Sequence, residues 1–223
     1  MYSPLFNVVF NVFFKPYYRS RVRKLWILGQ LPNFSTKLPI IIIANHFSWW
    51  DGFLIRSVKE YFCCNRQYSF FMGAEQFQTR RWMRWLGAIP MDANRPASVL
   101  KAIRKVSQLR REKGSKLFFF HYPEGQLIRP WSKQNHWRRG VELVLKNFQP
   151  AECWILAQQL EFGSSPRAAA FLHLKRLGPT EEVSVTGLRK SWLQASAELQ
   201  TAIEGTPDCN PEMKASLWNA IPC

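Results

Sequence analysis

A histidine and an aspartate five positions apart are the first residues of the chain whose types and spacing suit proton transfer. His46 follows Leu38–Ala44, an isoleucine-rich run that predicts a buried strand, and Asp51 comes on the next helical turn. A carboxylate there can accept a hydrogen bond from one ring nitrogen, fix the tautomer and leave the other nitrogen basic. The pair predicts a general base at a strand end. The alternative is a histidine that is satisfied structurally or lies on the surface.

The chain offers no evident nucleophile of its own for such a base. It has no Gly-x-Ser-x-Gly elbow, and neither Cys63 nor Cys64 has a base nearby in sequence. We therefore expect a hydroxyl of the substrate to be the nucleophile. The five cysteines include no Cys-x-x-Cys pair and no histidine at zinc-ligand spacing, which predicts a reducing compartment and no metal site.

A second candidate stretch is "FHYPEGQLIR", residues 120–129. Pro123 ends the preceding strand and Gly125 allows a tight turn, so Glu124 stands on a rigid corner. There it can accept hydrogen bonds from substrate hydroxyls or orient backbone donors. An ordinary surface turn is the alternative.

A third candidate stretch is "WLGAIPMDANRP", residues 85–96. A short strand or sheet edge at 87–90 precedes Arg95, which stands at a helix start. An arginine beside free backbone N–H groups suits a phosphate. A plain helix entry with a solvated arginine is equally compatible.

The elements that must position these residues alternate along the chain. A helix is predicted from Pro96, ending before Gly114, and another from about Arg189 to Ile203. Besides Leu38–Ala44, the strand candidates are Lys116–His121, Cys153–Ala157, Ala168–Leu174 and Val183–Val185. This order predicts a single α/β domain with a mixed central sheet flanked by helices and with catalytic groups at strand ends.

The N-terminal segment reads as an amphipathic helix that stays on the protein, because it lacks the pattern of a cleaved signal peptide. Its narrow polar stripe is Ser3, Asn7, Asn11 and Lys15, and apolar residues fill the rest. A helix this short lies in the membrane interface rather than across it, and basic residues follow at once. The alternative is packing on the protein's own core. We expect an interfacial segment at 1–24, a main domain at 25–204 and an irregular tail at 205–223.

The formal net charge of +16, from 31 Lys and Arg against 15 acidic residues, predicts anionic partners. Two clusters interleave arginine with tryptophan, at residues 80–85 and 131–139. They suit interfacial anchoring at an anionic membrane, base stacking on nucleic acid, or amphipathic faces with partly buried tryptophan.

Three stretches in this order resemble the glycerolipid acyltransferase family, which includes the 1-acylglycerol-3-phosphate acyltransferases. They are Asn45-His46-x4-Asp51, Gly87–Arg95 and Tyr122–Gly125. The resemblance covers roughly residues 25 to 160, and Trp154–Ala157 is a poor match to the family's fourth block.

The resemblance implies a reaction and a set of roles. His46 would be the general base on an acceptor hydroxyl, oriented by Asp51, without a covalent acyl-enzyme, cofactor or metal. The donor would be the thioester of acyl-CoA or acyl carrier protein. The acceptor, a lysophospholipid such as 1-acylglycerol 3-phosphate, would be bound by Asn45, Arg95, Glu124, Gly125 and Arg129. Members of the family sit on the cytoplasmic membrane face, so we expect a peripheral or monotopic protein.

Two departures from the family pattern concern the acceptor. Two residues separate Asp92 from Arg95, where the family has the arginine directly after the aspartate, and Gln126-Leu127 replaces the usual Thr-Arg. Acylation of another lipid hydroxyl, on a glycosylated or isoprenoid lipid, is therefore an alternative. A non-catalytic basic module that binds anionic lipid or nucleic acid is the other. We expect nucleic acid to be the less suitable partner.

Overall fold

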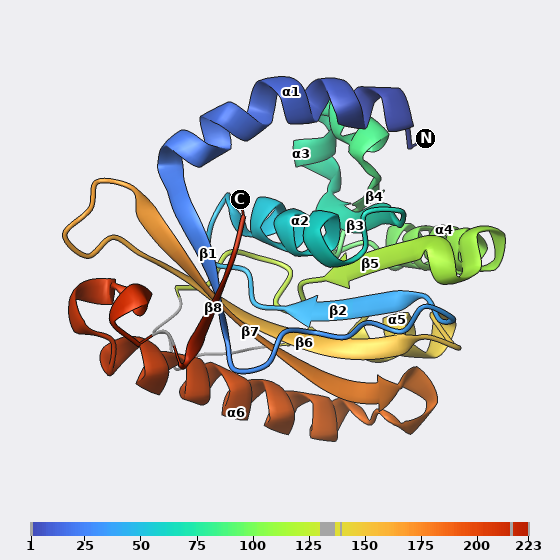
Figure 1. Ribbon diagram of the computed structural model, residues 1–223. Coiled ribbons are helices and arrows are strands. Elements are labelled where there is room, and N and C mark those ends of the chain that lie inside the picture. Colours follow the sequence, from blue (N-terminus) through green and yellow to red (C-terminus); the bar gives the residue numbers. More distant parts are fainter. Residues whose placement is uncertain (1, 130–136, 139, 215, 223) are drawn as a thin grey trace.

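A mixed sheet runs through the centre of the molecule (Figure 1). The computed structural model describes residues 2–129, 137–138, 140–214 and 216–222. Within them the sheet has eight strands in the order β4-β3-β5-β2-β6-β7-β1-β8. The strands are β1 Val22–Leu28, β2 Ile40–Ala44, β3 Gln67–Gly73, β4 Ala88–Met91, β5 Leu117–His121, β6 Glu152–Glu161, β7 Ala168–Pro179 and β8 Trp218–Ile221.

Strand direction brings the candidate residues to one edge of the sheet. Strands β4, β3, β5, β2 and β6 are mutually parallel, so their carboxyl ends share that edge. Strand β7 is antiparallel to β6, and β1 is parallel to β7, so both of these strands begin at the same edge. Ligands of α/β proteins bind outside the carboxyl ends of such strands.

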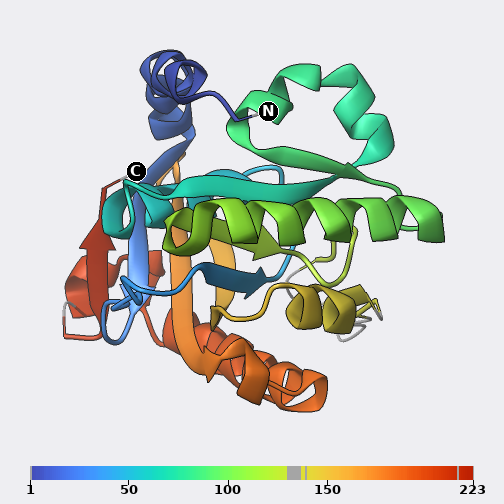
Figure 2. The ribbon, with the colours of Figure 1, turned by 90° about the vertical axis from the view of Figure 1, so that its right-hand side faces the viewer.

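Helices cover both faces of the sheet, as the predicted α/β class requires, and Figure 2 shows the layers from the side. One core includes residues of α1 and α2, and the other includes residues of α4, α5 and α6. In β2, Ile40 and Ile42 face the first core while Ile41 and Ile43 face the second, and all four are fully buried. The helices are α1 Pro4–Arg21, α2 Asp51–Phe62, α3 Ala74–Thr79, α4 Pro96–Lys113, α5 Gly140–Asn147 and α6 Val185–Glu204.

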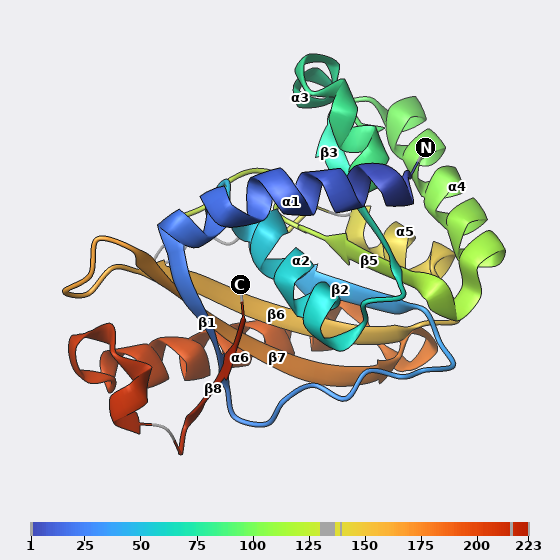
Figure 3. The same cartoon turned by 45° about the horizontal axis from the view of Figure 1, so that its top comes forward.

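Helix α1 lies alongside α2 (Figure 3), and two residues of its polar stripe, Asn7 and Asn11, contact the rest of the protein. Asn7 donates from Nδ2 to the carbonyl oxygens of Ser3 and Trp85 at 2.8 and 3.2 Å, and Asn11 Oδ1 accepts from Arg56 at 2.9 Å. The aromatic side chains Phe6, Phe10, Phe14 and Tyr18 pack on the same core. Asn7 and Asn11 therefore face inward, contrary to the expected place of the stripe on a membrane-bound helix, while Lys15 is exposed.

The opposite face of α1 is apolar and exposed. It consists of Leu5, Val8, Val9, Val12, Phe13 and Tyr17, with Phe13 at 76% exposure. Helix α1 thus packs on the protein's own core with one face and presents an apolar face to the outside. It has features of both predicted alternatives, packing on the core and a membrane-interface helix. No helix in the described ranges is long and apolar enough to cross a bilayer.

Two sequence expectations for the C-terminal third are wrong. Val183–Val185 is not a strand, because Ser184 caps α6 by accepting from Gly187 N–H at 3.0 Å and Val185 begins that helix. The tail after 205 is not wholly irregular: it forms short 3₁₀ turns and then β8, which pairs antiparallel with β1. A four-residue strand leaves little periodic signal, and long-range pairing fixes it. The expected boundary at residue 24 falls inside β1.

Candidate active site

The loop between β2 and α2 is built around the carboxylate of Asp51. Oδ2 accepts from the backbone N–H groups of Phe47 and Ser48 at 2.7 and 2.9 Å, and Oδ1 accepts from Ser48 Oγ at 2.6 Å. Asp51 is fully buried and is the first residue of α2, where the helix dipole favours a negative charge. These bonds hold the carboxylate in one orientation.

His46 is the fourth partner of that carboxylate. Its Nδ1 lies 2.8 Å from Asp51 Oδ2, and its side chain is 28% exposed. With Nδ1 donating to the carboxylate, the neutral ring keeps its lone pair on Nε2. The ring of Tyr122 stacks on the imidazole at 4.2 Å between centroids and 6° between planes. The predicted contact between His46 and Asp51 is therefore present in the fold.

Asn45 contacts the neighbouring strand. Its Nδ2 donates to the carbonyl oxygen of Gln158 and its Oδ1 accepts from Gln158 N–H, both at 2.9 Å. Gln158 also donates from Nε2 to the Asn45 carbonyl at 3.0 Å. Both polar atoms of the Asn45 side chain are thus engaged by β6, directly beside His46.

The loop after β5 folds against the His46 loop. Ile128 N–H donates to the His46 carbonyl at 2.7 Å, and Gly125 N–H donates to the Tyr122 carbonyl at 3.2 Å, closing a turn. Gly125 has a φ of +66°, a region that other residues rarely adopt. Glu124 stands on this turn as predicted, but it is buried rather than solvated.

Burial changes the proton affinity of Glu124. Desolvation raises its pKa to about 8, helped by the charge of Asp51 and opposed by backbone hydrogen bonding to Glu124 itself and to His46. Glu124 Oε2 is buried without a hydrogen-bond partner among the described residues. A carboxyl with this pKa is largely protonated at neutral pH, so Glu124 can donate a hydrogen bond as well as accept one.

The second candidate stretch lies at the start of α4, at the same sheet edge. Arg95 immediately precedes the helix, its side chain is 82% exposed, and its Nε lies 3.2 Å from Asp92 Oδ2. Asp92 N–H donates to Ser98 Oγ at 2.9 Å, which fixes the strand-to-helix turn. Arg95 is thus placed at an anion-compatible helix start, with its guanidinium paired to Asp92. Arg129 is exposed and follows directly on Ile128.

Arg138 connects the second and third stretches, a role that sequence reasoning missed. Its N–H donates to the Pro123 carbonyl at 2.9 Å, and Nη1 donates to Asn94 Oδ1 at 3.3 Å. A Cβ on Gly125 would lie 2.9 Å from Arg138 Nε, so the side chain passes directly over the glycine. The sequence placed Arg138 only in an aromatic-basic cluster, of which 131–136 and 139 lie outside the described residues.

The other aromatic-basic cluster packs against α1. Trp85 contacts Phe6 at 4.9 Å between centroids, and Trp82 contacts Phe10 at 5.9 Å. Its tryptophans are therefore partly buried against α1, as in the third alternative considered for this cluster. Arg80 lies over exposed Trp49, with 5.1 Å from the guanidinium carbon to the ring centroid, beside the His46 loop.

Metal-ligating chemistry gains no support elsewhere in the described ranges. They contain no group of three or more His, Cys, Asp or Glu side chains placed to hold a metal ion. His121 packs edge-on to Phe71, and burial lowers its pKa to about 4. It is therefore a neutral core residue.

Comparison with known proteins supports the same family. The model of the family described as Acyltransferase matches residues 28–146, more than half of the chain. The crystal structure of the 1-acyl-sn-glycerophosphate (LPA) acyltransferase PlsC from Thermotoga maritima is similar, with a TM-score of 0.55 and 17% identity over 88% of this chain and 78% of that one. No curated protein matches the chain. The chain therefore belongs to the acyltransferase family, and its α/β fold is that of the PlsC enzyme.

Proposed function

We propose that the protein transfers a fatty acyl group from a thioester donor to a hydroxyl of a lysolipid at a membrane surface. The observation that carries this proposal is the 2.8 Å contact of His46 Nδ1 with a buried carboxylate, on a ring whose other nitrogen has no hydrogen bond to any described residue and can act as a base. Membership of the acyltransferase family supports the reaction class.

The proposed step needs no nucleophile from the chain. His46 Nε2 takes the proton of the acceptor hydroxyl as its oxygen attacks the thioester carbonyl carbon. The tetrahedral intermediate collapses, the carbon–sulfur bond breaks, and the leaving thiolate takes the proton from the imidazolium. The products are an ester and a free thiol. Asp51 stabilises the imidazolium between these two proton transfers and keeps the ring oriented.

The acceptor is proposed to bind on the β5 and β4 side of His46. Glu124, protonated at neutral pH, can donate to an acceptor oxygen without repelling a nearby phosphate. Arg138 and Arg95 supply positive charge at the same end of the sheet, which favours an anionic lysolipid such as 1-acylglycerol 3-phosphate. An uncharged lipid hydroxyl would offer these arginines no charge to bind.

The membrane side is proposed to be the outer face of α1. Its exposed apolar residues form one continuous face, and Lys15, Arg19 and Arg21 lie on the later turns of the same helix. An apolar face beside cations suits peripheral binding to an anionic, cytoplasmic leaflet. Such docking would deliver the lysolipid directly from the bilayer.

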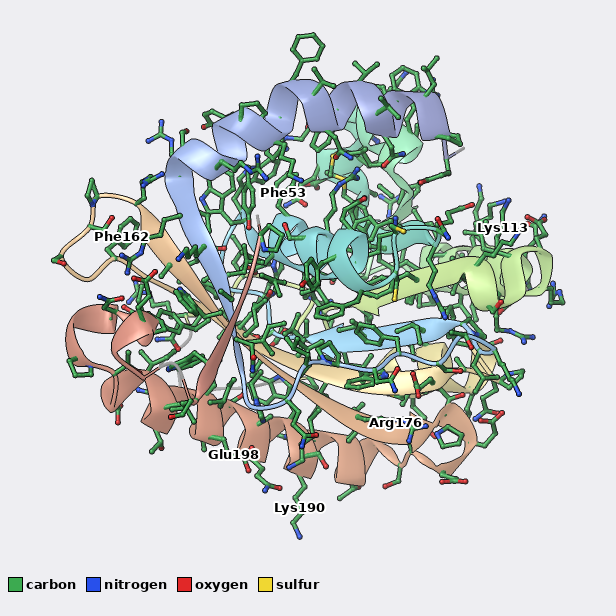
Figure 4. The ribbon with its side chains drawn as sticks, in the orientation of Figure 1. Phe53, Lys113, Phe162, Arg176, Lys190 and Glu198 are labelled. Carbon is green, nitrogen blue, oxygen red and sulfur yellow. The ribbon has the colours of Figure 1, made fainter. Side chains whose placement is uncertain are left out.

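The test is acyl transfer by purified protein from labelled acyl-CoA, and separately from acyl carrier protein, to a panel of lysolipids. His46→Ala is expected to lower turnover by about 10² to 10⁴ or more, since it removes the base. His173→Ala is the matched control, because His173 Nε2 also contacts a carboxylate, Glu198 Oε2 at 3.0 Å, on the α6 side of the sheet (Figure 4). That variant should keep full activity.

The two variants separate the proposal from its competitors. Equal activity of His46→Ala and the parent, with both proteins monodisperse, would remove His46 as the base. A protein that binds anionic vesicles in a salt-sensitive manner but transfers no acyl group from any donor would instead be a binding module.

A further inference from the structure

Tyr122 stands next to the proposed base but has no part in the proton transfers described above. It follows directly on β5, and His46 comes two residues after β2. The two strands are parallel neighbours, with Ile43 paired to His121 (Figure 1). The residues that follow these strands therefore leave the sheet side by side, which brings an aromatic ring to the imidazole.

The phenol ring of Tyr122 covers one face of that imidazole. The two centroids are 4.2 Å apart and the two planes differ by only 6°. Asp51 contacts the imidazole differently, at the edge nitrogen Nδ1. One partner thus binds an edge of the His46 ring and the other lies against its face, and neither contact involves Nε2.

The Tyr122 ring is itself fixed by its neighbours. Phe120 contacts it edge-on, with 5.2 Å between centroids and 72° between planes, and the ring packs against the first core. The Tyr122 carbonyl accepts from Gly125 N–H at 3.2 Å, which closes the turn behind it. A ring held in this way restricts the rotation of the imidazole on which it stacks.

The contact also has an electrostatic consequence. The face of an aromatic ring is negative and attracts a cation that lies within about 6 Å of the centroid. Burial of the Tyr122 hydroxyl raises its pKa well above the ordinary value, so the ring is an uncharged phenol at neutral pH. In the proposed reaction, His46 is an imidazolium between the two proton transfers. The ring contact is therefore stronger in that intermediate than in the ground state, which is the condition for lowering a barrier.

We propose that Tyr122 is a positioning residue that stabilises the imidazolium form of His46 through its ring face. This assignment rests on the acyl transfer proposed above. Asp51 then acts on the edge of the imidazole and Tyr122 on its face. No bond to Tyr122 forms or breaks, and its hydroxyl exchanges no proton with the substrate.

The first experiment observes the imidazole directly, by NMR titration of its ring proton in the full-length protein, with the signal assigned by its absence in His46→Ala. The midpoint should fall by about half to one pH unit in Tyr122→Leu, because leucine has no negative face. Tyr122→Phe restores a ring and should restore the midpoint. Tyr61→Leu removes an exposed tyrosine near the other end of α2 and is the matched control, with an unchanged midpoint.

Leucine differs from tyrosine in shape as well as in charge distribution, so a fluorinated ring gives the sharper comparison. Trifluorophenylalanine incorporated in place of Tyr122 keeps the shape of phenylalanine but withdraws electron density from the ring face. It should lower the midpoint relative to Tyr122→Phe while the melting temperature stays the same. Equal midpoints for the fluorinated and unfluorinated rings would overturn the proposal, even if Tyr122→Leu fails to fold.

Turnover provides a second readout. Tyr122→Leu should lower kcat about three- to tenfold with both KM values unchanged, and the acidic limb of the pH profile of kcat/KM should move to lower pH. Glu124, with a pKa of about 8, is protonated over that limb, and Asp51 is the same in every variant, so neither accounts for a difference. A lower rate without movement of the limb would mean that Tyr122 has only a structural role.

A double variant tests whether the effect passes through the imidazole. In the His46→Ala background, Tyr122→Leu should cause no further loss of the residual rate, because there is no imidazolium to stabilise. A further loss of the same size as in the parent background would assign Tyr122 to the structure of the loop and overturn the proposal.

These readouts separate failure of this proposal from failure of the proposed function. A parent that transfers no acyl group, but whose His46 midpoint falls in Tyr122→Leu, would disprove the transferase and support the ring contact. An active parent whose midpoint and acidic limb are the same in every variant would disprove the ring contact and leave the transferase.

Discussion

The side chain of Asn45 and the backbone of Gln158 form a reciprocal pair of hydrogen bonds, each 2.9 Å long. The regular β2–β6 ladder ends one residue earlier, at Ala44 opposite Leu156. The amide of Asn45 thus takes the place of the next peptide group. The chain can turn away from the sheet at this point without leaving β6 unpaired, and His46 is directed to the sheet edge.

Asn45→Ala should reduce kcat rather than weaken acceptor binding. The variant leaves Gln158 N–H and C=O unpaired, which costs about 1 to 3 kcal/mol of folding free energy. Displacement of His46 by as little as an ångström can lower the rate on the order of 100-fold. Steady-state kinetics should show the loss in kcat with the acceptor KM nearly unchanged. Asn65→Ala, at an exposed position, is the control; a rise in KM alone would instead place Asn45 on the substrate.

Glu124→Gln should flatten the pH dependence of stability between pH 6.5 and 8. The folded-state pKa of about 8 exceeds the ordinary value, so the folded protein binds the proton more tightly than the unfolded chain. Stability is therefore lost as pH rises from the ordinary value toward 8, by up to about 1.4 kcal/mol per unit. Urea unfolding at several pH values measures this slope, which glutamine removes.

The pH range begins at 6.5 so that the titration of His121 does not contribute to the measured slope. Burial lowers the pKa of His121 to about 4, so its contribution to stability is lost as pH falls from 6.5 toward 4, the opposite direction. Glu142→Gln, which changes an exposed side chain on α5, is the control and should keep the parent slope. A parent whose stability is flat from pH 6.5 to 8 would mean that Glu124 ionises without penalty.

Arg138→Gln should raise KM for phosphate-bearing acceptors about tenfold, the loss expected for one charged hydrogen bond. KM for an uncharged acceptor should stay the same, which distinguishes charge recognition from a general collapse of the turn. Arg104→Gln, with an exposed arginine on α4, supplies the control. Equal changes for charged and uncharged acceptors would assign Arg138 to the structure of the loop alone.

Gly125→Ala should displace the guanidinium group of Arg138, which lies over the glycine. The added methyl group meets Arg138 Nε at 2.9 Å, and the backbone φ of +66° penalises alanine by about 1 to 2 kcal/mol. The melting temperature should fall, and the acceptor KM should shift as it does in Arg138→Gln. Gly114→Ala also places alanine at a positive φ, but with open space around its Cβ, so it should lower the melting temperature without changing KM.

Phe13→Asp should reduce binding to anionic vesicles by about 10- to 100-fold. Phe13 is the most exposed side chain of the outer α1 face, and burying a phenylalanine in an apolar medium contributes roughly 1.5 to 3 kcal/mol. Co-sedimentation with vesicles measures the effect. Leu193→Asp, which changes an exposed side chain on α6, should bind as the parent does. Undiminished sedimentation of Phe13→Asp would show that α1 does not meet the bilayer.

The sequence predicted the site best where the determinants are local. The isoleucine run of β2, the spacing of His46 and Asp51, and the Pro123–Gly125 turn each depend on neighbours in the chain, and all appear in the structure. The orientation of α1 was not predictable from its own pattern, because a narrow polar stripe can face water or buried partners. Arg56, which binds Asn11, lies 45 residues away.

Long-range contacts account for the remaining differences. The position of Asn45 next to His46 predicts a site residue. Only the structure of β6 shows that the Asn45 amide is hydrogen-bonded to the backbone of Gln158. Arg138 approaches Gly125 through a loop whose path no periodicity reveals. Strand β8 exists because β1 offers it an edge, a fact that its four residues do not encode.

Asp51 is at once the first residue of α2 and the partner of the imidazole. Its position is therefore tied to the packing of Leu54, Ile55 and Val58, which anchor the helix in the core and are fully buried. A substitution that lets the helix slide or rotate slightly would spoil the alignment of an otherwise intact histidine. In a screen of random variants scored by turnover, such core positions would emerge alongside the chemical residues, and their loss would be repaired by compensating changes in side-chain volume rather than in charge.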